Sequence, residues 1–89
     1  MSGDISISHS ELFKAILSIK TEQECKEFFE DLCTAKELDS MTQRIIAAKL
    51  LLDGQTYEKI ISKTDISSAT LSRVSRCVKY GDGYKKILK

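Results

Sequence analysis

The stretch from Ile45 to Leu52 limits what this 89-residue chain can fold into more than any other. It closes a helix predicted over residues 35–53, which begins amphipathic and then becomes apolar on almost every side, with an interruption at Lys49. A helix that is apolar all round has to be surrounded by other elements, and a single small domain has too few of them to enclose it. The pattern therefore predicts an obligate homodimer in which two copies interlock around these helices.

Composition and capping signals favour an all-α fold of five to six helices. The chain has no Pro and four Gly, and no stretch alternates apolar and polar residues for long enough to predict a strand. Capping boxes of the type Ser/Thr-x-x-Glu begin at Ser8, Thr21 and Thr34, and each is expected to open a helix. The three helices predicted in this way span residues 9–19, 22–33 and 35–53, the last with Gly54 as its C-terminal cap.

A chain of this length is expected to form one domain. The predicted divisions are a mobile N-terminal tail (1–7) and a helical domain (8–89), the latter made of a dimerisation core (8–54), a helix-turn-helix (55–79) and a C-terminal helix (80–89). Two glycines and an aspartate at residues 81–83 are expected to form a turn without a phosphate-binding role. In the helix after this turn, Tyr84, Ile87 and Leu88 are expected to cover the core.

Two short helices joined by a tight turn are predicted over residues 56–78. Asp65 falls where such a motif needs a residue that tolerates a positive φ, and Ser67 is a strong N-cap for the second helix. Apolar residues recur from Leu71 at i, i+3 and i+7, which predicts one buried stripe. The opposite face is small, hydroxylated and basic, with no acidic residue, and this chemistry suits entry into a DNA major groove.

The predicted DNA-binding residues divide into short side chains near base edges and basic side chains at phosphates. The short side chains near base edges are Ser67, Ser68, Ala69, Thr70 and Ser72. The basic side chains at phosphates are Arg73, Arg76, Lys79 and Lys63. The alternative is a surface helix hairpin whose polar face is only solvated.

Charge is segregated along the chain. Residues 1–54 carry six Lys/Arg against ten Asp/Glu, a net charge of −4, and residues 55–89 carry eight against three, a net charge of +5. The positive part contains the predicted helix-turn-helix, so binding of that part to a polyanion is favoured.

Other features argue against several classes of protein. Three cysteines, an odd number, favour reduced thiols in a cytoplasmic protein. No apolar run approaches the length of a membrane span, and the first residues lack a signal-peptide pattern, so no membrane partner is expected. One His and no Cys-x-x-Cys pair predict no metal site and no cofactor. No catalytic constellation points to an enzyme.

The stretches FFEDLCTAKELDSMTQRIIAAKLLLDGQTYEKI and ISSATLSRVSRCVKYGDGYK, together with their spacing, resemble the Trp repressor superfamily. The closer resemblance is to its shorter, Trp-repressor-related bacterial branch, and it covers nearly everything from Thr21 onward. The resemblance implies an intertwined all-helical homodimer that presents two helix-turn-helix heads, in agreement with the homodimer predicted from the central helix.

The resemblance also implies an effector pocket, which in the Trp repressor holds L-tryptophan between two arginines. The matching positions here are Arg44 and Arg73. Where the family has a glycine and a serine that complete the pocket, this chain has Val74 and Cys77. Since a valine branch intrudes on such a cavity and a thiol forms weaker hydrogen bonds, we expect no tight binding of L-tryptophan.

These features predict a sequence-specific DNA-binding transcriptional regulator, a repressor, that acts as a homodimer on a palindromic operator in double-stranded DNA. The alternative is a protein–protein adaptor, in which the helix-turn-helix is a scaffold that docks on the transcription machinery without sequence-specific DNA binding.

Overall fold

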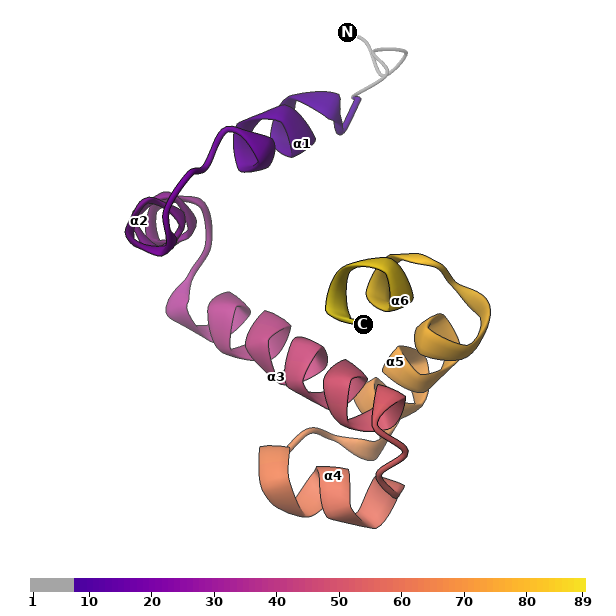
Figure 1. The fold of residues 1–89 in the computed structure, drawn as a ribbon. Helices are drawn as coiled ribbons and strands as arrows, with labels where there is room; N and C mark the ends of the chain where they lie inside the picture. The colour runs from indigo at the N-terminus through magenta and orange to yellow at the C-terminus, as the bar shows by residue number, and fades with distance from the viewer. Residues whose placement is uncertain (1–7) are drawn as a thin grey trace, which may run out of the picture. The chain divides into compact units, whose positions relative to one another are not determined.

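A computed structural model describes residues 8–89, and within that range the chain is all-helical, with six α-helices and no strand (Figure 1). The all-α prediction is therefore confirmed, whereas the predicted mobile tail lies outside the described residues. The helices are α1 (Ser10–Leu17), α2 (Glu22–Leu32), α3 (Ala35–Leu52), α4 (Tyr57–Thr64), α5 (Ser68–Tyr80) and α6 (Gly83–Leu88). They fall into two compact units, the first ending at Thr34 and the second spanning Ala35–Lys89.

Thr21 forms the predicted N-cap of α2, and the Glu24 side chain accepts from the N–H of Lys20. The cap predicted at Ser8 does not form. Thr21 Oγ1 accepts a hydrogen bond from the backbone N–H of Glu24 at 3.0 Å. The helix that follows Ser8 begins at Ser10, after His9, whose side chain makes no capping bond. Ser8 Oγ instead accepts from the N–H of Ser10, two residues on, at 3.1 Å. This local turn competes with the cap, so α1 begins one residue later than predicted.

The first unit leaves its apolar side chains incompletely covered. Neither α1 nor α2 contains a fully buried residue. On α2, Phe28 and Phe29 are half-buried, and Leu32 is 49% exposed. A pair of short helices offers too little surface to cover both apolar sides.

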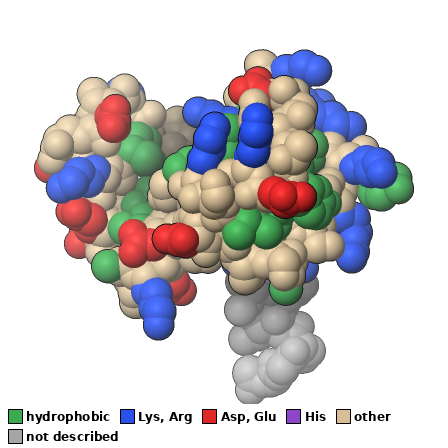
Figure 2. All heavy atoms as spheres, turned by 90° about the horizontal axis from the view of Figure 1, so that it is seen from below, with side chains coloured by type: hydrophobic (Ala, Val, Ile, Leu, Met, Phe, Trp, Pro, Cys, Tyr) green, Lys and Arg blue, Asp and Glu red, His purple; other side chains and the backbone are tan. Residues whose placement is uncertain are grey.

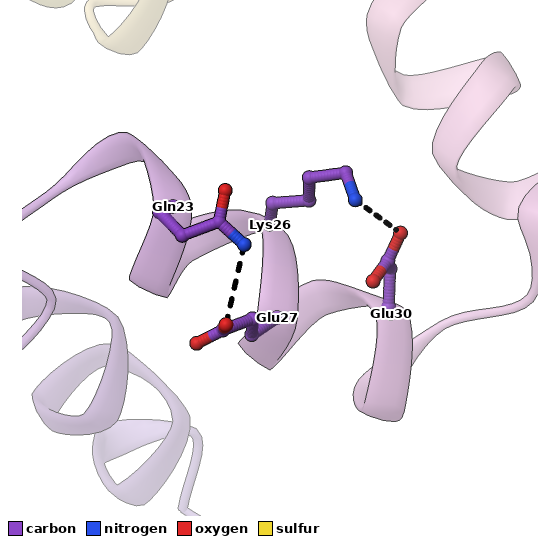
Figure 3. Close-up of polar contacts among 4 residues, drawn as sticks. All are labelled: Gln23, Lys26, Glu27 and Glu30. Atoms are coloured by element: carbon purple, nitrogen blue, oxygen red, sulfur yellow. Dashed lines mark hydrogen bonds and ion pairs between the residues drawn. The ribbon is translucent and has the colours of Figure 1, made fainter.

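The outer face of α2 is solvated and held by local polar contacts (Figure 3). Lys26 Nζ lies 3.2 Å from Glu30 Oε2, and Gln23 Nε2 donates to Glu27 Oε2 at 3.2 Å. Both pairs are exposed and four residues apart, so each stabilises the helix by only about 0.2–0.5 kcal/mol. The acidic residues of this face therefore form an ordinary solvated surface.

In the second unit, α4, α5 and α6 all pack on α3 (Figure 1). The fully buried core consists of Ala47, Ala48, Ile60, Ile66, Leu71 and Val74. The two alanines are the contribution of α3, and their small side chains let neighbouring helices approach closely. Full burial of a side chain as large as Ile60 or Leu71 contributes roughly 1.5–3 kcal/mol, so these few residues dominate the stability of the unit.

The long helix α3 ends as predicted at a glycine. Gly54 has a φ of +83°, and its N–H donates to the Leu51 carbonyl at 3.0 Å. The N–H of Gln55 donates to the Leu50 carbonyl, also at 3.0 Å. These two bonds form a Schellman motif, which satisfies carbonyls that the end of a helix leaves without intrahelical partners.

The other helices of one chain enclose α3 only in part. Ala47 and Ala48 are buried, but Ile45 is 44% exposed and Ile46 is 43% exposed. The two isoleucines precede the buried alanines along the helix, and α4 to α6 cover them only in part.

Two helices flank Asp65 as predicted, and a hydroxyl side chain caps the amino end of each. Thr56 Oγ1 accepts from the Lys59 N–H at 3.3 Å, and Ser67 Oγ accepts from the Thr70 N–H at 3.1 Å. Asp65 adopts the left-handed conformation, with a φ of +58°, as the turn requires. The next residue, Ile66, is buried in the core of the second unit, with an exposed fraction of 3%.

The last helix, α6, covers the core with fewer residues than predicted. Tyr84 and Leu88 are half-buried and pack against the core, as expected. Ile87 is 81% exposed, so its predicted role in the core is wrong. Residues three and four apart share one side of a helix, so the spacing does not separate Ile87 from Tyr84 and Leu88. The packing of α6 on α3 and α5 leaves Ile87 uncovered. Among the described residues, no helix combines the length and the apolar content that a membrane span requires.

Candidate nucleic-acid interface

The predicted DNA-binding residues lie mainly on the exposed face of α5. Leu71 and Val74 hold the opposite face in the core, with exposed fractions of 0% and 2%. Thr70 is half-buried, and the other predicted residues are exposed. The exposed ones are Lys63, Ser67, Ser68, Ala69, Ser72, Arg73, Arg76 and Lys79. The core packing therefore presents the small and basic residues of α5 to solvent on one side.

Hydroxyl groups organise the amino end of α5. Ser67 Oγ accepts from the backbone N–H of Thr70 and also donates to Thr70 Oγ1 at 2.9 Å. The Ser67 hydroxyl is thus used both as a donor and as an acceptor inside the cap. The adjacent Ser68, Ala69 and Ser72 have short exposed side chains, which allow another molecule to approach the helix backbone closely.

The electrostatics of α5 favour an anionic ligand. The helix contains no Asp or Glu, and its amino end adds the partial positive charge of the helix dipole. Arg73 and Arg76 are three residues apart, so their guanidinium groups leave the same side of the helix. Guanidinium groups can bind phosphate or the edge of guanine through paired hydrogen bonds.

Lys79 stands apart from the other predicted residues of α5. It lies in the last turn of the helix, about 18 Å from Ser67 along the axis at the usual rise per residue. Its ammonium group lies 5.9 Å from the centre of the Tyr80 ring, and its carbonyl oxygen accepts from Lys85 Nζ at 3.2 Å. Lys79 is therefore joined to Lys85 of α6. Lys63 lies in the last turn of α4.

An open apolar groove of about 530 Å³ lies where α3, α5 and α6 meet. It is lined by Ile45, Cys77, Gly81, Gly83, Tyr84, Ile87 and Leu88. Hydrophobic side chains also reach the surface elsewhere in the chain, as the face drawn in Figure 2 makes visible. The groove is thus one of several apolar areas that the single chain leaves exposed.

In the single chain the four residues of the expected effector pocket differ in their surroundings. Arg44 and Arg73 are exposed, Val74 is buried in the core, and Cys77 lines the apolar groove. Sequence reasoning missed the groove because it assigned Ile87 to the core. The apolar residues of the last helix, at 84, 87 and 88, have the spacing of one buried side, so the sequence carried no signal that Ile87 would stay exposed.

The fold and the exposed face of α5 define a class of small all-helical proteins in which a long helix carries two short capped helices, the second of them basic and without acidic residues. The sequence profile of the family described as Trp repressor protein matches residues 8–89. The chain belongs to this family.

Three relatives illustrate the family. The uncharacterized protein YerC of Bacillus subtilis (strain 168) is 49% identical over 79 residues, which is 88% of this chain and 76% of YerC. The crystal structure of a candidate Trp repressor from Staphylococcus aureus superposes with a TM-score of 0.85 at 45% identity, covering 89% of this chain and 80% of that one. A TrpR-like protein from Eubacterium eligens ATCC 27750 gives 0.84 at 48% identity, with 88% and 81% coverage.

Proposed function

We propose that the protein is a sequence-specific DNA-binding transcriptional regulator, a repressor, that acts as a homodimer on a palindromic operator. One observation carries the proposal: the face of α5 opposite Leu71 and Val74 is exposed, short-chained and basic, with no acidic residue. An ordinary solvated helix mixes acidic and basic residues, as α2 does. Membership of the Trp repressor family supports a DNA-binding role at the level of the family.

In this proposal α5 enters the major groove by its amino end. Ser67, Ser68, Ala69, Thr70 and Ser72 would lie near base edges or their bridging waters, and Arg73, Arg76, Lys63 and Lys79 would hold phosphates. Since the amino end of a recognition helix approaches the bases, Lys79, in the last turn of α5, would contact only the flanking backbone.

A second copy of the chain would cover the apolar side chains that one copy leaves exposed. On α1, Phe13 is 56% exposed and Leu17 is 82% exposed. These two residues are four apart, so they form one apolar side. The groove bordered by Ile45 and Ile87 offers an apolar surface on the second unit. We propose that α1 and α2 of each copy pack on the second unit of the other.

Charge supports this arrangement. The exposed face of α2 is acidic, whereas α6 carries basic residues in its last turn and no acidic residue in its first. Opposite charges at the edge of an apolar interface favour one orientation of docking over others.

Selection from random duplexes tests the proposed function. The purified protein should recover a palindrome whose half-sites are about one helical turn apart. Recovery of no preferred sequence would contradict the proposal and support the alternative, a protein–protein adaptor that uses the same helices as a scaffold.

Arg76→Ala should weaken binding to all duplexes by a similar factor, because a phosphate contact carries no sequence information. The variant loses one phosphate contact in each half-site. The negative slope of the logarithm of the DNA-binding constant against the logarithm of the salt concentration should therefore become shallower by roughly 1 per lost contact. Titrations at several salt concentrations measure this slope. Lys36→Ala, which removes a positive charge from the exposed start of α3, is the control and should leave it unchanged. An unchanged slope for Arg76→Ala would remove Arg76 from the interface.

L-Tryptophan should not bind tightly, because Val74 and Cys77 replace the small and hydroxylated residues expected of a tryptophan pocket. Isothermal titration calorimetry of the dimer should detect no dissociation constant in the micromolar range or below. A variant with Val74→Gly and Cys77→Ser restores the family pattern and serves as the comparison. Micromolar binding by the unaltered protein would contradict the prediction.

A further inference from the structure

The turn between α4 and α5 is joined to α3 by a side chain that the proposed DNA contacts do not use. Gln43 lies near the middle of α3, and its Nε2 donates to the carbonyl oxygen of Thr64 at 3.0 Å. The bond is partly buried and joins residues 21 positions apart in the sequence. Thr64 is the last residue of α4, so its carbonyl is one of those that a helix leaves without an intrahelical partner.

Thr64 is also the residue on which the turn itself is built. Its Oγ1 donates to the Ile60 carbonyl at 2.7 Å and accepts from the backbone N–H of Ile66 at 3.3 Å. Asp65, between them, adopts the left-handed conformation that reverses the chain. Hydrogen bonds to α4, to the turn and to α3 therefore all meet at Thr64. Ile66, two residues further on, is buried, with an exposed fraction of 3%.

We propose that Gln43 is a positioning residue that fixes the turn between α4 and α5, and with it the recognition helix α5, at a set angle to α3. This inference rests on the proposed function in one respect: α3 would lie in the common core of the homodimer, so the angle between α5 and α3 sets the separation of the two recognition helices. That separation determines which spacing of half-sites the dimer accepts.

The chemistry of the side chain agrees with this role. A neutral amide supplies an N–H donor without bringing a charge into a partly buried site, where a charge would be costly. Methionine has nearly the same length and shape but no donor, so Gln43→Met removes the hydrogen bond with little change in packing. Gln23→Met is the matched control, because Gln23 makes an exposed bond within α2.

Hydrogen exchange of the free protein gives the first test. In Gln43→Met, the amides of Asp65 and Ile66 should exchange about fivefold faster, as expected when one hydrogen bond is lost. Amides in the core of α5, at Leu71 and Val74, should keep their protection, and Gln23→Met should change none of the four. Faster exchange of all four amides to the same extent would mean that Gln43 only adds to overall stability, and unchanged exchange would mean that the bond does not hold the turn. Either result overturns the proposal.

The second test measures binding to palindromes in which the spacer between half-sites varies by single base pairs. The unaltered protein should strongly prefer one spacing. Gln43→Met should bind that duplex roughly two- to tenfold more weakly. It should also discriminate less against duplexes whose spacer is one base pair longer or shorter. An equally sharp preference would overturn the positioning role. If the unaltered protein selects no palindrome, the proposed function fails, while the exchange experiment still decides whether Gln43 holds the turn.

Discussion

Leu71→Ala is expected to lower the free energy of unfolding by about 2–5 kcal/mol, because it removes a fully buried side chain and leaves a cavity. Leu71 has an exposed fraction of 0% and lies in the small core that joins α3, α4 and α5. Proteins of this size are stable by only about 5–15 kcal/mol, so the loss is a large part of the total. The same cavity would loosen α5, and affinity for DNA should fall with stability.

Denaturant titration at a fixed protein concentration measures this change, since the apparent stability of a homodimer depends on concentration. Ser72→Ala is the control, because it alters the neighbouring exposed position and should change stability by no more than about 0.5 kcal/mol. A loss of less than about 1 kcal/mol for Leu71→Ala would mean that the core around α5 rearranges to fill the space.

Phe13→Asp is expected to separate the proposed homodimer and abolish tight binding to a palindrome. Phe13 is 56% exposed in the single chain, and in the proposal a second copy covers it. A carboxylate there would have to be buried without a partner or keep the copies apart. A monomer engages one half-site at a time, and loss of the second head should cost at least about 100-fold in affinity.

Sedimentation equilibrium at micromolar concentration, together with titration of a palindromic duplex, measures both effects. Lys14→Asp places the same carboxylate at the next position of α1, where the native side chain is already charged, and should remain dimeric. Phe13→Ala provides a milder change that should weaken the dimer without introducing a charge. A Phe13→Asp variant that stays dimeric would show that α1 takes no part in the interface, and a monomeric unaltered protein would contradict the homodimer altogether.

Local signals predicted much of the fold because they depend on a few adjacent residues. Thr21 and Ser67 cap their helices through the predicted backbone bonds, and Gly54 and Asp65 adopt the positive φ values that their positions imply. Ser8 shows the limit of such signals. Its hydroxyl can bond to the second or to the third amide ahead, and the sequence does not determine which one it takes.

Features that depend on which side of a helix faces the core were harder to predict. The spacing of Tyr84, Ile87 and Leu88 places all three on one side of the last helix, so the sequence alone could not decide that Ile87 would stay exposed while Tyr84 packs against the core. The groove beside them was missed for the same reason. Gln43 was missed because a polar residue on a long helix resembles a solvated one until its partner, 21 residues further on, is located.

The short connection before α6 shows how a glycine can be required for a reason unrelated to ligand binding. The N–H of Gly81 donates to the Cys77 carbonyl at 2.8 Å, and a Cβ added at Gly81 would lie 2.7 Å from that same oxygen. Every other amino acid has a Cβ, so the collision is common to all substitutions, whatever their size or charge. A glycine kept at this position in other members of the family would therefore report the backbone geometry that folds α6 back, and would carry no information about a bound nucleotide.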